Sequence, residues 1–403
     1  MTIQQPNSHQ NHALNASRNE AVLRRKLIAA RAGFFTGGFT VASWAPIIPF
    51  VQSELSLEPA VLGSLLFGLG IGSFFGMPIA GTISTRLGNR TALAASGILS
   101  CLLLVVLALI PGFRIESAAL LLYGVTLGCL EVSANIYGAQ IEKEAGRPLM
   151  SGLHAAYSIG EVVSAGAITG LLVLGVPLVW TVGGLMAVLA AVLLWALSGI
   201  SSSEGRSSAK REGMVFAPAR GRILMLSLVC MAVFLAEGAM LDWSAIYVHE
   251  VGGVDIKAAG IGYTLFVIAM AVSRLMGDRL VARFGRARVL ITGMLLNIGT
   301  LVAMVLADSP VVLFASLFIM GLGIANVAPV LISAASASKG TDPTAAITTV
   351  TTIGYGGLMA GPAVLGFIAQ HSSLETAFLF IAALLTASLL NEVRMSRRLA
   401  SRS

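Results

Sequence analysis

Two glutamates stand inside apolar runs where a charged side chain is costly. Glu131 lies in the stretch GCLEVSANIYGAQ, residues 128–140, with Asn135 one helical turn later, and Glu161 lies in HAAYSIGEVVSAG. On insertion scales a charge at the centre of a bilayer costs at least about 2.5–3.5 kcal/mol. Such a carboxyl therefore faces a cavity or a partner, or it carries a proton.

A buried carboxyl of this kind can perform one useful reaction, the uptake and release of a proton. Low dielectric disfavours the charged form of a carboxyl. A carboxyl that is protonated from one side of a membrane and deprotonated to the other couples proton flow to the movement of a solute. We interpret Glu131 as a proton carrier or a substrate contact. The alternative is a permanently protonated carboxyl that bonds two helices together, and Glu161 has the same two interpretations.

Other polar residues lie close enough in sequence to share this chemistry. His154 and Ser158 fall on the helical face of Glu161. His154 could relay protons, or it could cap polar groups near the membrane interface. Asn135 could bond a substrate hydroxyl or hold Glu131. Glu237 lies deep in a later apolar run, and we expect its carboxyl to face a cavity and to join the proton-coupling groups.

Aromatic side chains near the ends of apolar runs are the candidates for binding a solute ring. Trp44, Trp243 and Tyr247 could stack on a sugar, although aromatics at such places are also typical membrane-interface anchors. Trp44 and Trp243 occupy matching places in the two halves of the chain. Asn326 roughly mirrors Glu131 in the second half and is a further candidate for substrate binding.

The composition predicts helices that cross a membrane. The chain has 403 residues, of which 56% are hydrophobic and only 11% are charged, whereas soluble domains have about 25% charged residues. Apolar runs long enough to span a bilayer recur throughout, without the regular alternation of a membrane barrel. The sequence therefore predicts an all-α polytopic membrane protein with twelve spans, at 27–51, 60–83, 91–111, 117–140, 150–173, 177–198, 222–249, 258–281, 288–308, 310–334, 345–370 and 374–393.

The chain divides into two similar halves. RLGNR at 86–90 and RFGRA at 283–287 each follow the second span of a half, and the Ser- and Arg-rich stretch between the halves is typical of a linker. We expect two pseudo-symmetric six-helix bundles. The predicted segments are a disordered N-terminus at 1–22, bundles at 23–198 and 222–393, a linker at 199–221 and a tail at 394–403.

The positive charges indicate topology. Every basic residue except Arg114 and Lys257 falls at the termini or beside loops on one side, which predicts cytoplasmic termini. The net charge of +7 is thus explained without a nucleic-acid partner. No nucleotide-binding motif, metal cluster or nucleophile–base pair is present, so we expect no cofactor and no enzymatic activity.

The loop after the second span carries a family signature. In GTISTRLGNRTAL, residues 81–93, the spacing of glycines and basic residues resembles the signature of the major facilitator superfamily. The resemblance implies twelve spans, alternating access and a gating role for this loop. Thr85 stands where an aspartate is usual in that family. The matching positions are Gly81, Arg86, Gly88 and Arg90 in the first half and Arg283 and Gly285 in the second.

A closer resemblance covers most of the chain. WAPIIP, LEVSANIYGAQIEKEAGRPLMSGLHAAYSIGE and AEGAMLDWSAIYV resemble the YbjJ-type bacterial members of the superfamily, which are similar to fucose permeases. The resemblance implies sugar and proton symport with an acid on the fourth helix, where Glu131 stands. The first span lacks the acid that fucose-type permeases carry there.

We therefore expect a monomeric inner-membrane transporter that couples protons to the symport of a small neutral polar solute such as a sugar. A neutral solute is favoured because no basic residue is expected at midplane depth, since Arg31, Arg274 and Arg279 are placed near the cytoplasmic surface. The alternative is proton-driven efflux of an amphipathic or cationic compound. A hypothesis of another class is a membrane scaffold or receptor that transports nothing.

Overall fold

The computed structural model describes residues 8–147, 149–200, 217–338 and 340–400, and its regular elements there are helices. Two of the twelve predicted spans are each built from two helices. The elements are α1 (Ser8–Trp44), α2 (Ile48–Glu54), α3 (Pro59–Leu87), α4 (Asn89–Leu109), α5 (Phe113–Ala145), α6 (Met150–Val173), α7 (Leu178–Leu197), α8 (Gly221–Glu250), the 3-10 turn η1 (Ile256–Ala258), α9 (Gly260–Phe284), α10 (Arg286–Val305), α11 (Pro310–Ile324), α12 (Val327–Ser336), α13 (Pro343–His371) and α14 (Leu374–Ala400).

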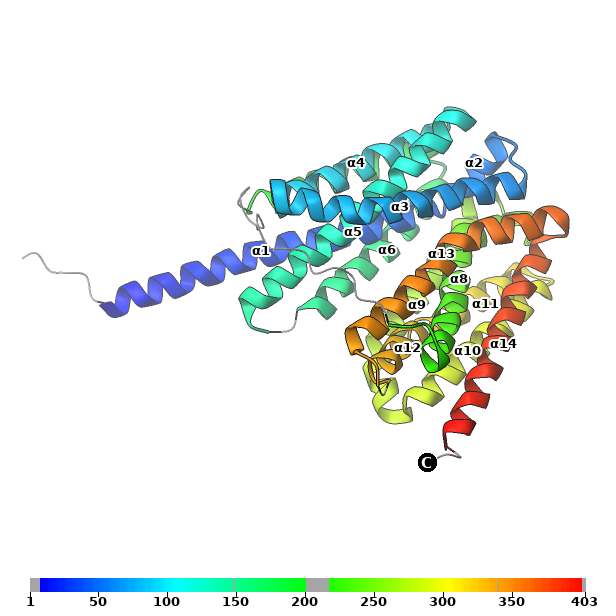
Figure 1. Cartoon of the computed structure of the whole chain (residues 1–403). Helices are drawn as coiled ribbons and strands as arrows, with labels where there is room; N and C mark the ends of the chain where they lie inside the picture. The colour runs from blue at the N-terminus through cyan, green and yellow to red at the C-terminus, as the bar shows by residue number, and fades with distance from the viewer. Residues whose placement is uncertain (1–7, 148, 201–216, 339, 401–403) are drawn as a thin grey trace, which may run out of the picture.

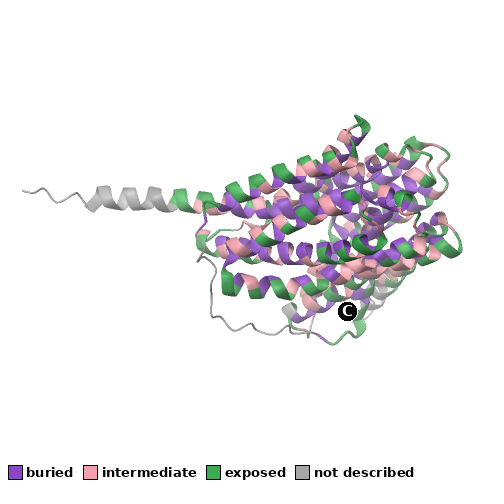
Figure 2. Ribbon diagram, turned by 90° about the horizontal axis from the view of Figure 1, so that it is seen from above, coloured by how far each residue is buried: buried purple, intermediate pink, exposed green. Residues whose placement is uncertain are grey.

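The prediction of twelve spans is confirmed. Twelve helical segments are long and apolar enough to cross a membrane, the first formed by α1 with α2 and the tenth by α11 with α12. Large apolar side chains are exposed on the outside, among them Phe75, Leu174 and Trp180, and Figure 2 shows the buried residues gathered between the helices. In water such exposure would be costly, but against lipid it is the expected surface of a membrane protein.

The first and tenth spans are interrupted for identifiable reasons. Pro46 lacks a backbone N–H, and the first span stops at Trp44 and resumes at Ile48, with Pro49 in the first turn of α2, where proline is tolerated. In the tenth span α11 ends at Ile324 and α12 begins at Val327. There the Asn326 side chain donates hydrogen bonds to α9.

The N-terminal segment differs from its prediction. Residues 1–22 were expected to be disordered, but α1 begins at Ser8 and runs without a break into the first span. Residues 8–22 contain neither glycine nor proline, and extending an existing helix avoids the cost of nucleation. Of the expected linker, residues 201–216 lie outside the described residues, as do residues 1–7 and 401–403.

Small residues bring the helices of each bundle into close contact. α3 and α5 pack through Gly72, Gly76, Gly124 and Gly128, where an added Cβ atom would meet the backbone of the opposite helix. α8 and α13 approach closely at Gly357, whose Cβ would meet the carbonyl of Met231. This is the small-residue packing that membrane helices use in place of a hydrophobic driving force.

The two bundles meet at one end of the molecule. Twelve passes place both chain ends on one side, here called the terminal end, and the opposite side is the far end. In Figure 1 the bundles touch near α2, α3 and α13 and diverge toward the terminal end. We call the contacts that join them the far-end closure. It comprises a 2.7 Å hydrogen bond from Gln52 to Glu250, a 3.1 Å hydrogen bond from Gln370 to Glu58, and the packing of Gly63 on Gly366.

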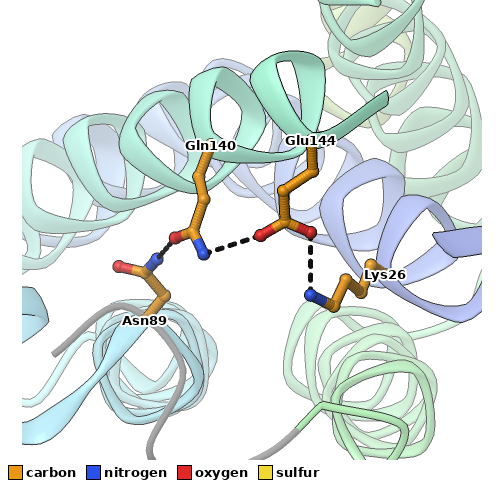
Figure 3. A network of polar contacts seen from close by, with 4 residues as sticks. All are labelled: Lys26, Asn89, Gln140 and Glu144. Carbon is orange, nitrogen blue, oxygen red and sulfur yellow. Dashed lines mark hydrogen bonds and ion pairs between the residues drawn. The ribbon is translucent and has the colours of Figure 1, made fainter. Parts of the chain in front are cut away.

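A polar network fastens the terminal end of the first bundle (Figure 3). Lys26 of α1 forms a 2.8 Å ion pair with Glu144 of α5, Gln140 donates to Glu144 at 3.1 Å, and Asn89 of α4 donates to Gln140 at 2.8 Å. The network therefore links three helices inside one bundle, directly beside the signature loop.

We predict that Lys26→Met lowers stability only slightly. The ion pair is partly open to solvent, with the Lys26 and Glu144 side chains 18% and 37% exposed, and such pairs contribute about 0–1 kcal/mol. Thermal unfolding in detergent measures the effect, with the exposed Lys257→Met as the control. A loss of folding in the Lys26 variant alone would contradict this prediction.

Candidate functional site

An ion pair lies in the membrane-spanning part of the second bundle. The guanidinium of Arg274, on α9, lies 3.2 Å from the carboxylate of Glu237, on α8, and the two side chains are 37% and 26% exposed. Arg274 is 14 residues from the start of α9, which is about 21 Å along a helix. The pair therefore lies near the middle of the span and remains partly accessible.

A second acid faces this pair from the first bundle. Glu161 of α6 is buried, in hydrogen-bonding contact with Ser158, and it interacts electrostatically with both Arg274 and Glu237. α6 packs against α9 across the bundle interface. One arginine of the second bundle thus pairs with an acid of its own bundle and interacts electrostatically with an acid of the other.

Glu131 of the first bundle is linked to this pair through Tyr355, which interacts electrostatically with all three side chains. It is half-buried on α5, and no hydrogen bond or ion pair of its carboxyl is present among the described residues. Tyr157 of α6 and Tyr355 of α13 both interact with it electrostatically. The Asn135 side chain donates to the backbone carbonyl of Glu131 at 2.9 Å. The Asn135 amide therefore bonds to the backbone of its own helix and not to the Glu131 carboxyl.

Two glycines of α1 allow Tyr157 of α6 to pack closely against that helix. The ring of Tyr157 lies against Gly37, and the backbone of Tyr157 occupies the place that a Cβ on Gly38 would take, so α1 and α6 can approach closely. Tyr157 interacts electrostatically with Tyr263 and Tyr355 of the other bundle. We call Glu131, Tyr157, Glu161, Glu237, Tyr263, Arg274 and Tyr355 the central cluster.

Arg274 corrects the sequence analysis. It was placed near the cytoplasmic surface, because a basic residue near the end of a span was interpreted as a topology signal. α9 extends to Phe284, so ten more residues follow Arg274 before the helix ends. The predicted eighth span ended at 281, three residues before α9 does, and this placed Arg274 only seven residues from the end of the span. The expectation that no basic residue reaches the midplane was therefore wrong.

His154 lies at the edge of the cluster. It is exposed on α6, seven residues nearer the terminal end than Glu161, and its ring packs edge-on against Phe34 with ring centres 5.1 Å apart. It also interacts electrostatically with Arg274. This position between the cluster and the terminal end is compatible with the predicted proton relay, which stays a prediction.

Four predicted substrate contacts are engaged in packing or hydrogen bonds within the protein, and their role in binding a solute stays a prediction. Trp44 and Trp243 are only 2% and 0% exposed and pack in the apolar core. The Tyr247 hydroxyl donates to the Met304 carbonyl at 3.2 Å, and the Asn326 amide donates to the backbone carbonyl and the hydroxyl of Ser273 at 3.0 Å each. Their polarity was visible in the sequence, but the side of the helix that each one occupies depends on packing.

The signature loop forms a tight corner between helices. Gly88 and Gly285 adopt φ angles of +94° and +80° between α3 and α4 and between α9 and α10, a region that glycine enters without strain. Arg90 donates to the Ile200 carbonyl at 3.3 Å. Among the described residues, the Thr85 hydroxyl donates only to the backbone carbonyls of Gly81 and Thr82 of its own helix.

The remaining signature residues surround these corners. Arg86 is exposed at the end of α3 and Gly81 is buried one turn earlier, while the Arg283 guanidinium lies 5.4 Å from the centre of the Phe284 ring. Position 85 therefore supplies no charge to a contact between bundles, and the gating role of the loop stays a prediction.

Two bundles of six spans with charged groups between them are the architecture of membrane transporters. Residues 32–262 and 253–398 match the Major Facilitator Superfamily, and the chain belongs to this family of transporters, which are not enzymes. An uncharacterized MFS-type transporter of Yersinia pestis is 37% identical over 361 residues, 89% of this chain and 92% of the relative. An uncharacterized transporter of Sinorhizobium fredii is 33% identical over 358 residues, 87% of this chain and 93% of the relative.

A solved structure shows the same fold. The crystal structure of the nucleoside transporter NupG superposes with a TM-score of 0.72 at 15% identity, covering 93% of this chain and 98% of that one. At this identity the similarity establishes the arrangement of the helices alone.

Proposed function

We propose that the protein is a proton-coupled symporter of a small neutral polar solute, working as a monomer by alternating access in the inner membrane with both termini in the cytoplasm. The observation that carries the proposal is the central cluster, in which one guanidinium pairs with Glu237 of its own bundle and interacts electrostatically with Glu161 of the other, while Glu131 interacts with Tyr157 and Tyr355. Carboxyls held away from water can exist without charge at little cost. Their protonation can therefore follow the side of the membrane to which the cluster is open.

The charge of the cluster favours a neutral solute. Arg274 is already paired with Glu237, and Glu131 and Glu161 add two further acids. An organic anion would meet an excess of negative charge, whereas sugar hydroxyls could bond to carboxyls and to the phenols of Tyr157 and Tyr355. A nucleoside is also a neutral polar solute and belongs among the compounds to be tested. The resemblance to YbjJ-type proteins and fucose permeases supports the same class.

The far-end closure indicates the state in the cycle. With cytoplasmic termini, a molecule closed at the far end and diverging at the terminal end faces inward. The opposite state requires the hydrogen bonds from Gln52 and Gln370 to break and the terminal ends to approach. The central cluster is then reached from outside in one state and from the cytoplasm in the other. A proton taken up from outside is therefore released to the cytoplasm.

Replacement of Glu131 tests the proposal. Glu131→Gln is expected to abolish accumulation driven by a pH gradient while solute binding and exchange persist, because glutamine resembles a carboxyl that cannot release its proton. Candidate solutes are neutral monosaccharides, polyols and nucleosides, screened by thermal shift on purified protein and then by uptake into liposomes. The control is Glu116→Gln, which alters a fully buried acid of the same helix. Unchanged accumulation in the Glu131 variant would refute proton coupling at this residue.

The excess of acids in the cluster also favours one other function, proton-driven efflux of an organic cation. A cation would bind by pairing with the carboxyls, so Glu131→Gln or Glu237→Gln would abolish binding itself. Titration of organic cations by thermal shift therefore separates the two functions. Binding of a neutral solute that survives Glu131→Gln supports symport, and binding of a cation that is lost supports efflux.

A further inference from the structure

A polar cavity lies at the far end, beside the hydrogen bond that joins Gln52 to Glu250. It has a volume of about 240 Å³ and is lined by the end of α2 in the first bundle and the end of α8 in the second. Its polar lining consists of Gln52, Ser53, Ser56, His249 and Glu250, none of which belongs to the central cluster. Drug-sized ligands occupy about 300–1,000 Å³, so this cavity suits a smaller organic molecule.

The wall formed by α2 is held by a regular helix end. The backbone N–H of Leu57 donates to the Gln52 carbonyl at 3.0 Å, and that of Ser56 donates to the Ser53 carbonyl at 3.2 Å. Ser56 has a φ angle of +48°, in the left-handed region that glycine usually occupies at helix ends of this kind. The position therefore carries a hydroxyl in the cavity lining where glycine would supply none, and the wall is both preformed and polar.

The wall formed by α8 contributes a hydrogen-bond acceptor. Nδ1 of His249 lies 2.8 Å from the backbone carbonyl oxygen of Val254. A carbonyl only accepts hydrogen bonds, so Nδ1 carries the hydrogen and Nε2 of the neutral ring is left as an acceptor. Among the described residues the ring makes no second hydrogen bond. The Nε2 atom can therefore accept a hydrogen bond from a ligand.

The carboxylate of Glu250 gives the cavity a negative charge. Oε1 of Glu250 accepts from Nε2 of Gln52 at 2.7 Å, and among the described residues neither Glu250 Oε2 nor Gln52 Oε1 takes part in a further hydrogen bond. Glu250 is exposed, whereas Gln52 is only 9% exposed. The described residues that line the cavity include no lysine or arginine. The charge of the carboxylate is therefore not balanced by the lining itself.

We propose that this cavity binds a small organic cation that carries a primary ammonium group. An ammonium has three N–H donors and no acceptor, which complements the free oxygens of Glu250 and Gln52 and the Nε2 atom of His249. The positive charge balances the Glu250 carboxylate, whereas an anion would be repelled. Binding at this second site goes beyond the proposed function and does not depend on it.

The cation stabilises the closed far end, because the walls of the cavity belong to different bundles. Opening separates Gln52 from Glu250 and takes the cavity apart, so the cation binds the closed state alone. A ligand that binds one of two states shifts the equilibrium toward that state. At ten times its dissociation constant the open population falls about tenfold. The cation therefore inhibits transport from outside, a consequence that does rest on the alternating access of the proposed function.

Calorimetric titration of purified full-length protein with ethanolamine measures the binding. Glu250→Gln keeps an acceptor for Gln52 but removes the charge, and it should weaken binding more than about tenfold, since charge-assisted hydrogen bonds are the stronger ones. His249→Phe removes the Nε2 acceptor and should weaken binding roughly threefold to tenfold. The matched control is Glu54→Gln, which neutralises an exposed acid of α2 outside the cavity lining and should leave binding unchanged.

Thiol labelling from outside measures the effect on closure without any solute. Thr169 of α6 is 4% exposed, and its hydroxyl occupies the place that a Cβ on Gly260 of α9 would take, across the bundle interface. A Thr169→Cys protein in liposomes should react with an impermeant maleimide when the far end opens, and the native cysteines are buried. Ethanolamine at ten times its dissociation constant should slow this labelling about tenfold, and Glu250→Gln should remove the effect.

The outcomes separate this proposal from the proposed function. Equal binding of neutral ethylene glycol, or of tetramethylammonium, which has no N–H donor, overturns the class of ligand, as does binding of Zn²⁺ in place of ethanolamine. Ethanolamine binding that survives Glu250→Gln but is lost in Glu131→Gln belongs to the central cluster and overturns the far-end site. If ethanolamine slows labelling while no neutral solute accumulates on a pH gradient, the symport proposal fails and the far-end site stands.

Discussion

Gly63→Trp is expected to hold the far end open. A Cβ atom at position 63 of α3 would lie 2.5 Å from the Pro362 carbonyl oxygen and 3.1 Å from the Gly366 Cα atom. The neighbour is backbone of α13 and cannot rotate away, so the closed state is destabilised while the open state is unaffected. Overpacking of this kind costs about 1–3 kcal/mol, which shifts the equilibrium roughly tenfold to a hundredfold.

A spin-label pair, on cysteines that replace Ser53 of α2 and Ser372 after α13, measures this result together with the rate of thiol labelling from outside. Both serines are exposed, on different bundles at the far end. The matched control is Gly68→Trp on the same helix, because a Cβ there meets nothing within 4 Å. Gly366→Trp should reproduce the effect from the other bundle, since its Cβ would meet the Pro59 carbonyl. A Gly63→Trp protein that still closes normally would show that this contact does not hold the far end together.

The fold could be predicted from the sequence because lipid imposes simple rules. Apolar length predicted the twelve spans, and the apolar runs around Glu131 and Glu161 placed these two acids inside them. The reciprocal far-end hydrogen bonds were not predicted. Gln52 and Glu250 are 198 residues apart, close to the offset between the two halves, so the internal repeat could have paired their helices. Their bonding still depends on which state of the cycle is present.

The site was predicted less well because a helix has several faces. Trp44 and Trp243 match between the halves, yet both point into the core rather than toward the central cluster. Tyr157, Tyr263 and Tyr355 were not predicted, since a tyrosine in an apolar run can be a core residue, an interface anchor or a site residue. Arg274 was missed for a different reason, because the topology rule and a functional site both use basic residues near helix ends.

Arg274→Gln is expected to reduce transport more than about tenfold while changing stability little. With the far end closed the pair with Glu237 is partly exposed, and such pairs contribute at most about 1 kcal/mol. In the alternating-access cycle that we propose, the terminal ends then close over the cluster and exclude water. Acids left without their cation would then cost several kcal/mol, because a buried charge has lost its partner, and about 1.4 kcal/mol already corresponds to tenfold in population.

The double variant Arg274→Gln with Glu237→Gln distinguishes this explanation from a simple loss of substrate contact. Removing both charges removes the penalty, so the outward-facing population, measured by the spin-label pair, should recover even if solute binding does not. Arg274→Lys keeps the charge without the planar fork and should preserve the population while weakening the hydrogen bond to Glu237. If the single variant transports normally, or if the double variant stays inward-facing, the shared cation does not balance the acids during the cycle.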